Sequence, residues 1–91
     1  MRQYRFSILW SASAQHDLVK LPEKVATAVV EFIYGGLADN PRRVEHALTM
    51  ELAGLHSARR GDFRVLYRIS DNEAGVSIVN IDHRADIYRR R

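Results

Sequence analysis

Cysteine is absent from the chain, which excludes disulfide bonds, thiolate nucleophiles and thiolate metal ligands. No apolar run is long enough to span a bilayer, and the start, Met1 to Arg5, is not followed by the hydrophobic segment of a signal peptide. The four histidines show no i, i+4 pairing, so no metal site is predicted. We therefore expect a cytosolic protein without metal or cofactor, stabilised by packing and hydrogen bonds.

The length and composition are those of a small globular protein. Its 91 residues are enough for one modest hydrophobic core and too few for two, so we expect a single domain over residues 1–91. Hydrophobic residues make up 46% and charged residues 27% of the chain, and neither a repeat nor a low-complexity stretch is present. This balance argues against disorder.

Lysine is absent from the last third of the chain, where the positive charge gathers. Residues 1–58 carry six basic and six acidic side chains, whereas residues 59–91 carry eight arginines and five acids. A planar guanidinium binds phosphate oxygens through two parallel hydrogen bonds, which a flexible ammonium does not. The pattern favours a nucleic-acid backbone as the ligand. The alternative is a solvated sheet face followed by a basic tail.

The first half of the chain predicts a strand and two helices. Alternating aromatic and polar residues indicate a half-buried strand from Tyr4 to Trp10. Ser11 or Ser13 then caps a short helix over residues 14–21. A second helix begins near Glu23, carries apolar residues at helical spacing, and ends between Gly35 and Asn40. Residues 44–52 are too mixed to assign beyond a short helical turn.

The second half predicts three strands in sequential hairpins, at about residues 54–60, 63–70 and 75–82. Together with the first strand they form an antiparallel four-stranded sheet, and the helical hairpin covers one of its faces. The predicted fold class is therefore α+β, with the order β-α-α-β-β-β and the second sheet face open.

The strand after the Gly61-Asp62 turn has two chemically different sides. Apolar residues alternate with Arg64, Leu66 and Arg68, so one side suits a core and the other an anion. We expect four cations from two adjacent strands and a strand end to converge on the open sheet face, where they repel one another unless an anion lies between them. These are Arg59, Arg60, Arg64 and Arg84.

The order of these residues resembles the RelE/ParE toxins of bacterial toxin–antitoxin pairs. In those proteins a Gly-Asp-(Tyr/Phe)-Arg-x-x-Tyr hairpin is followed by a last strand ending in His-Arg and a nearby Tyr. The matching residues here are Gly61 to Arg64 with Tyr67, then His83-Arg84 and Tyr88. The resemblance is strongest over residues 52–88 and implies a RelE-like fold.

The resemblance also implies roles for individual residues. Arg64 and Arg84 would neutralise the scissile phosphate of messenger RNA, with Arg59 in a neighbouring cationic position. His83 would move protons, with backbone positioning or a plain surface location as alternatives. Tyr88 would orient the nucleotide or, alternatively, pack the tail onto the core. The remaining arginines predicted to bind RNA are Arg60, Arg68, Arg89 and Arg90.

Other catalytic motifs find no support. Asp82 and His83 are neighbours on one strand and point to opposite faces, which makes a Ser-His-Asp triad built on them implausible. Gly35-Gly36 lacks the Lys and Ser/Thr of a phosphate-binding loop.

The sequence departs from the family pattern at two places. Many relatives carry Gly-Lys-Pro-Leu-Arg where this chain has Glu45 to Thr49, so His46 and Thr49 replace two expected cations. Ser57 also stands where a basic residue is common. These losses indicate a toxin of reduced cleavage rate.

The resemblance implies a metal-independent, ribosome-dependent endoribonuclease that stops translation and is held inactive by a cognate antitoxin. Operator DNA would be bound only through the antitoxin, and no membrane is involved. Two alternatives stay open at this point. One is a ParE-like gyrase inhibitor without catalysis, and the other is an attenuated toxin that acts as a corepressor with its antitoxin.

Overall fold

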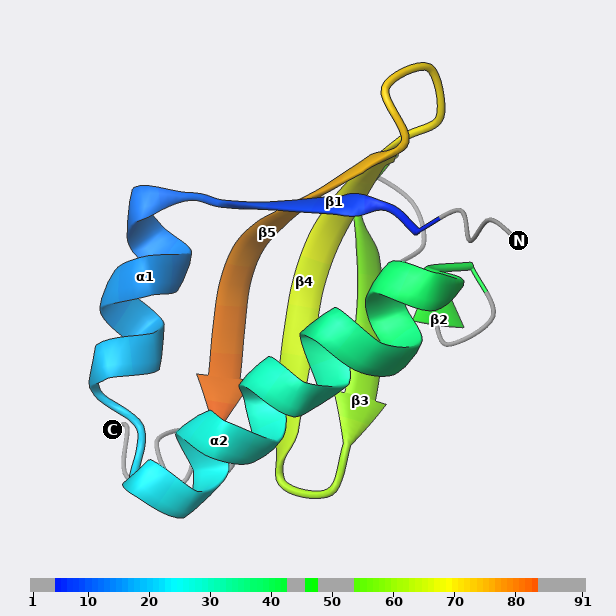
Figure 1. The fold of residues 1–91 in the computed structure, drawn as a ribbon. Coiled ribbons are helices and arrows are strands. Elements are labelled where there is room, and N and C mark those ends of the chain that lie inside the picture. Colours follow the sequence, from blue (N-terminus) through cyan, green and yellow to red (C-terminus); the bar gives the residue numbers. More distant parts are fainter. Residues whose placement is uncertain (1–4, 43–45, 48–53, 84–91) are drawn as a thin grey trace.

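The computed structural model describes residues 5–42, 46–47 and 54–83, which form a sheet with helices on one side. The elements in chain order are β1 (Ser7–Trp10), α1 (Ala12–Val19), α2 (Glu23–Phe32), the π-helical segment η1 (Ile33–Leu37), β2 (His46–Ala47), β3 (His56–Arg60), β4 (Phe63–Ser70) and β5 (Gly75–His83). The strands are ordered β1-β5-β4-β3-β2, and α2 crosses in front of the sheet (Figure 1). The predicted α+β class is confirmed.

The direction of β1 corrects one expectation. β1 pairs with β5 in parallel, with Ser7 opposite Gly75 and Trp10 opposite Ile78, while the other neighbouring strands pair antiparallel. Strands joined by short turns run antiparallel, but no short turn joins β1 to β5, so no local connection sets its direction. The sheet is therefore mixed. β2 adds a two-residue fifth strand in a segment where no strand was predicted.

The helix boundaries follow from local sequence. Ser11, rather than Ser13, caps α1, and its Oγ accepts a hydrogen bond of 2.9 Å from the backbone N–H of Ala14. The helix accordingly begins two residues earlier than predicted. Pro22 precedes α2, where its missing N–H removes no helical hydrogen bond. Helical structure then continues through η1 to Asp39, within the predicted limits.

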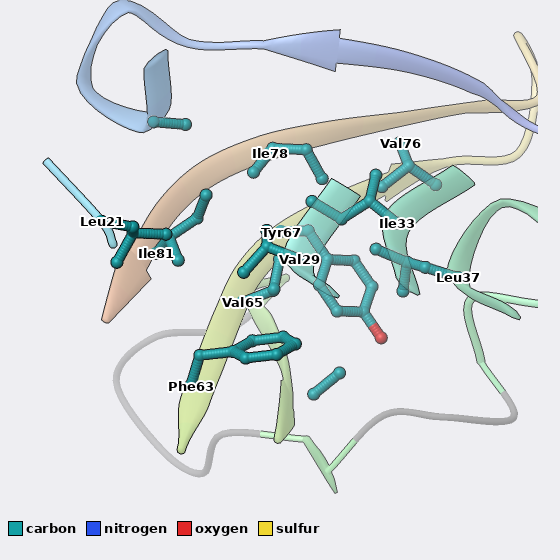
Figure 2. Close-up of a cluster of buried hydrophobic side chains, with 12 residues drawn as sticks. Leu21, Val29, Ile33, Leu37, Phe63, Val65, Tyr67, Val76, Ile78 and Ile81 are labelled. Carbon is teal, nitrogen blue, oxygen red and sulfur yellow. The ribbon is translucent and has the colours of Figure 1, made fainter. Parts of the chain in front are cut away.

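The core lies between α2 with η1 and the sheet face that they cover (Figure 2). On β4 the side chains of Phe63, Val65 and Tyr67 are buried, as the alternation predicted. The Tyr67 hydroxyl donates a 2.7 Å hydrogen bond to the carbonyl of Pro41. The other labelled core residues are Leu21, Val29, Ile33, Leu37, Val76, Ile78 and Ile81. This packing fixes β4 from one side.

Helix α1 lies along the edge of β5 where β1 ends. The Ser11 hydroxyl donates a 2.8 Å hydrogen bond to the carbonyl of Val79, and an Asp17 carboxylate oxygen accepts one of 2.9 Å from the backbone N–H of Ile81. These bonds satisfy backbone groups that β1 no longer reaches. The second half of β5 is thereby held in place.

The opposite face of the sheet is not covered by α1 or α2 (Figure 1). Within the described ranges, no helix is long and apolar enough to cross a membrane.

Candidate functional site

A row of three charged residues crosses the open face of the sheet. Arg64 is the central member, on β4, and strand pairing places Arg59 of β3 on one side of it and Asp82 of β5 on the other. Two cations directly opposite each other repel. The Asp82 carboxylate lies beside this pair of arginines and offsets part of their positive charge.

The contact between Arg64 and Asp82 is weak. Their nearest atoms, Nη2 and Oδ2, are 3.5 Å apart, and each side chain keeps 37% of its surface exposed. Charge-assisted hydrogen bonds between such groups are usually about 2.7–2.9 Å long. The Nε of Arg64 is buried and has no hydrogen-bond acceptor among the described residues. Because the Arg64 side chain is partly exposed and its contact with Asp82 is long, its terminal nitrogens can bind an anion that approaches the open face.

A β-bulge in β5 decides which residues face this row. The pairing register shifts between Leu66 and Tyr67, and Val79 is the extra residue on the opposite strand. Ile78 and Ile81, which are three residues apart, consequently both point to the core. Every side chain of β5 beyond the bulge lies on the face opposite to the one that simple alternation from Ile78 predicts.

His83 is the residue most affected by the bulge. It pairs with Phe63, on the core side, and only 8% of its surface is exposed. His83 therefore lies on the core side of the sheet and not beside the open-face arginines, because the bulge brings Asp82 to that face instead. Its role in proton transfer stays a prediction.

Arg60 also departs from the expected convergence. It pairs with Phe63, so strand alternation directs it to the helix-covered side of the sheet rather than to that of Arg64. Its guanidinium carbon lies 4.7 Å from the centre of the Phe32 ring, which is a cation–π contact. Arg60 therefore covers one end of the core, and RNA binding by this residue is still only a prediction.

Arg68 and Ser57 lie on the open face but outside the charged row. Arg68 is exposed and pairs with Ser77. It is four residues from Arg64 along β4, or about 13 Å. Ser57 is buried and pairs with Leu66, in the row next to Arg59 and Arg64. The open face is thus uncharged at this position.

Several predicted site residues lie outside the described residues. These are Arg84, Tyr88, Arg89 and Arg90, together with Thr49. Of the four cations expected to converge, the structure brings Arg59 and Arg64 together and separates Arg60 from them.

Two acidic residues that bind arginines have little signal in the sequence. Asp82 is one, and its only sequence signal is the polar pair Asn80 and Asp82 two residues apart, after an apolar strand segment. Asp71 is the other. It accepts hydrogen bonds of 2.8 and 2.9 Å from the two terminal nitrogens of Arg42, which hold the pKa of its carboxyl below the ordinary value. This exposed pair ties the segment after η1 to the turn between β4 and β5.

The arrangement on the open face can bind an anion and stabilise added negative charge on it. Arg64 and Arg59 supply adjacent guanidinium groups on a rigid strand pair. In the part of the chain that the structure describes, no three His, Asp or Glu side chains form a group able to hold a metal ion.

Relatives of known name share nearly the whole chain. A family model described as the ParE toxin of the type II toxin–antitoxin system, parDE, matches residues 8–88. The toxin RelG of Mycobacterium tuberculosis is 51% identical over 85 residues, covering 93% of this chain and 98% of RelG. The toxin RelE of the same organism is 48% identical over 84 residues, covering 92% of this chain and 87% of that protein.

Solved structures agree with these relationships. The toxin–antitoxin complex RelBE2 from Mycobacterium tuberculosis contains a chain with a TM-score of 0.88 and 46% identity, covering 93% of this chain and 98% of that one. The isolated RelE toxin of Escherichia coli has a TM-score of 0.72 at 15% identity and 92% coverage of both chains, a likeness of fold alone. The chain therefore belongs to the ParE toxin family of type II toxin–antitoxin systems, in the branch that includes RelE and RelG.

Proposed function

We propose that this toxin is a ribosome-dependent endoribonuclease that cuts messenger RNA in the cytoplasm and thereby stops translation. The observation that carries the proposal is the pair of adjacent guanidinium groups, Arg59 and Arg64, on the uncovered face of a rigid sheet. The RelE and RelG names of relatives about half identical in sequence support the same branch.

Arg64 is the group that we assign to the reacting phosphate. Its backbone is fixed by the buried neighbours Phe63 and Val65, so its guanidinium is presented from a rigid element. Negative charge grows on the phosphate oxygens as a ribose 2′-hydroxyl attacks, and a guanidinium already in place stabilises that charge. Arg59 adds a second cation from the neighbouring strand.

The remaining catalytic roles in the proposal rest on the family resemblance. Arg84 shares the phosphate with Arg64, and Tyr88 orients the nucleotide. Arg68, Arg89 and Arg90 hold the RNA backbone on either side. Proton transfer by His83 has less support, because that residue is buried on the other face of the sheet.

In this proposal the ribosome supplies the alignment of the reacting groups. The two arginines stay protonated and cannot act as a base, so they promote cleavage of a phosphodiester only if the 2′-hydroxyl, phosphorus and leaving oxygen are already aligned. Alignment of reacting groups accounts for much of such a barrier. We therefore assign the alignment to messenger RNA held on the ribosome. No step in this scheme requires a metal ion.

A cognate antitoxin is the second partner in the proposal. The solved relative from Mycobacterium tuberculosis is named as a toxin–antitoxin complex. Binding of this chain to operator DNA is proposed to occur only through that antitoxin. Co-expression with the small gene next to it should yield a complex that purifies as one species. Harmless expression of the chain alone at high level, without such a complex, would contradict this assignment.

The nuclease proposal is tested by incubating the purified toxin with one message, either translating or free in solution. We expect cleavage only in the translating reaction, unaffected by EDTA at concentrations that leave the ribosome intact. DNA supercoiling by gyrase should be unchanged. Gyrase inhibition without a cleaved message would place this chain with gyrase inhibitors instead.

A further inference from the structure

The charged row on the open face contains a carboxylate where a phosphate-binding site would be expected to have none. Asp82 is half-exposed, pairs with Arg64 across the strands, and is brought to this face by the bulge at Val79. β-bulges are often found beside active sites, where they redirect a side chain. Without this bulge, alternation from Ile78 would point Asp82 into the core.

The geometry of the Arg64–Asp82 pair is that of a weak ion pair that another anion can displace. The 3.5 Å separation between Nη2 and Oδ2 is too long for a strong charge-assisted bond, and the buried Nε of Arg64 has no acceptor among the described residues. A phosphate that binds the two terminal nitrogens of Arg64 together would make more contacts than Asp82 does. Asp82 therefore forms only a weak ion pair with the Arg64 guanidinium, and an anion can displace it.

We propose that Asp82 is a positioning residue for Arg64 and that its carboxylate competes with the substrate phosphate for the Arg64 guanidinium. This inference deepens the proposed function and rests on it. A phosphate that takes the guanidinium must displace Asp82 in the bound state and in the transition state alike. Competition of this kind lowers the affinity for the phosphate by the same amount in both states, and such a uniform change in binding leaves the maximal rate unchanged.

A purely structural role predicts a different outcome. If Asp82 only relieves repulsion between Arg59 and Arg64, its replacement lowers stability and leaves the affinity for anions and the half-saturating toxin concentration unchanged. The two roles therefore separate in a binding measurement and in a kinetic one.

The binding test uses inorganic phosphate and the full-length toxin, with the Arg64 Nε–Hε signal followed by NMR. The variant is Asp82→Asn, which keeps a polar side chain of equal size, and the matched control is Glu73→Gln, which removes the same charge from the exposed turn after β4. We expect Asp82→Asn to bind phosphate about three- to tenfold more tightly, as loss of one nearby solvent-screened charge predicts. Glu73→Gln should bind as the wild type does. Equal affinities for Asp82→Asn and the wild type, or the same gain in the control, would overturn the inference.

The kinetic test measures message cleavage on ribosomes at increasing toxin concentration. Asp82→Asn should reach half of its maximal rate at lower toxin concentration with the maximal rate unchanged, and Asp82→Glu should restore part of the wild-type half-saturating concentration. A change in maximal rate alone, without a shift in the half-saturating concentration, would contradict competition. If the wild type does not cleave message at all, the proposed function fails, while the phosphate titration still decides the role of Asp82.

Discussion

Replacement of Arg64 by alanine removes the central cation of the open-face row without touching the core side of β4. Among the described residues, the contact that this change breaks is the 3.5 Å pair with Asp82, between side chains that are each 37% exposed. Exposed pairs of this kind contribute about 0–1 kcal/mol, and solvent screens the Asp82 carboxylate that is left behind. We expect the free energy of unfolding to change by less than about 1 kcal/mol.

The expected effect on cleavage is much larger. Loss of one preorganised donor that stabilises transition-state charge typically costs roughly 3–4 kcal/mol, or a factor of about 10²–10³ in rate. Arg64→Lys should recover little of this, because an ammonium lacks the planar fork and cannot replace Nε. Lys24→Ala is the matched control, since it removes one exposed positive charge from α2.

The assay combines urea denaturation with the cleavage rate of a defined message in a translating extract. A large loss of rate at unchanged stability, seen for Arg64→Ala and absent for Lys24→Ala, supports the assignment. A folded Arg64→Ala variant that cleaves message as fast as the wild type would remove Arg64 from the mechanism.

Three further outcomes follow from the contacts described above. His83→Asn should lower stability because the side chain is buried, and should slow cleavage less than Arg64→Ala does; a greater loss of rate at unchanged stability would restore His83 to proton transfer. Tyr67→Phe should lower the free energy of unfolding by about 1–3 kcal/mol, measured by urea denaturation, because the buried Pro41 carbonyl loses its donor; unchanged stability would contradict this. The Asp71 carboxyl should titrate below its ordinary pKa by NMR and return to it in Arg42→Gln. Because the pKa of Asp71 is lowered in the folded state, the stabilisation that this ion pair gives the fold is complete above the ordinary carboxyl range and is lost as the pH falls through the lowered pKa. An Asp71 carboxyl with an ordinary pKa would contradict the ion pair with Arg42.

Local chemistry made most of the elements predictable. The cap of α1 could be narrowed to Ser11 or Ser13, and the start of α2 could be placed after Pro22, because each of these residues acts on its own helix end. The alternation from Phe63 to Tyr67 gave the two faces of β4, since its hydrophobic pattern is regular there. These features depend on residues close together in the chain.

Pairing between distant segments could not be predicted in the same way. The parallel direction of β1 depends on contacts with β5, and no turn sequence encodes it. The bulge at Val79 is a single extra residue, yet it exchanges the faces of Asp82 and His83. The spacing of Ile78 and Ile81 was the available signal, because strict alternation cannot bury both.

The central claim is that the open-face arginines cut messenger RNA only when the ribosome has aligned it. The most direct measurement is the ratio of the cleavage rate on a ribosome-bound message to that on the same message free in solution, for the wild type and Arg64→Ala. Alignment of reacting groups is equivalent to an effective concentration of about 10⁵ M or more, so we predict cleavage of the bound message and none detectable on the free one. The rate on the bound message should fall steeply in Arg64→Ala. Equal rates on bound and free message, or a bound-message rate independent of Arg64, would contradict the account.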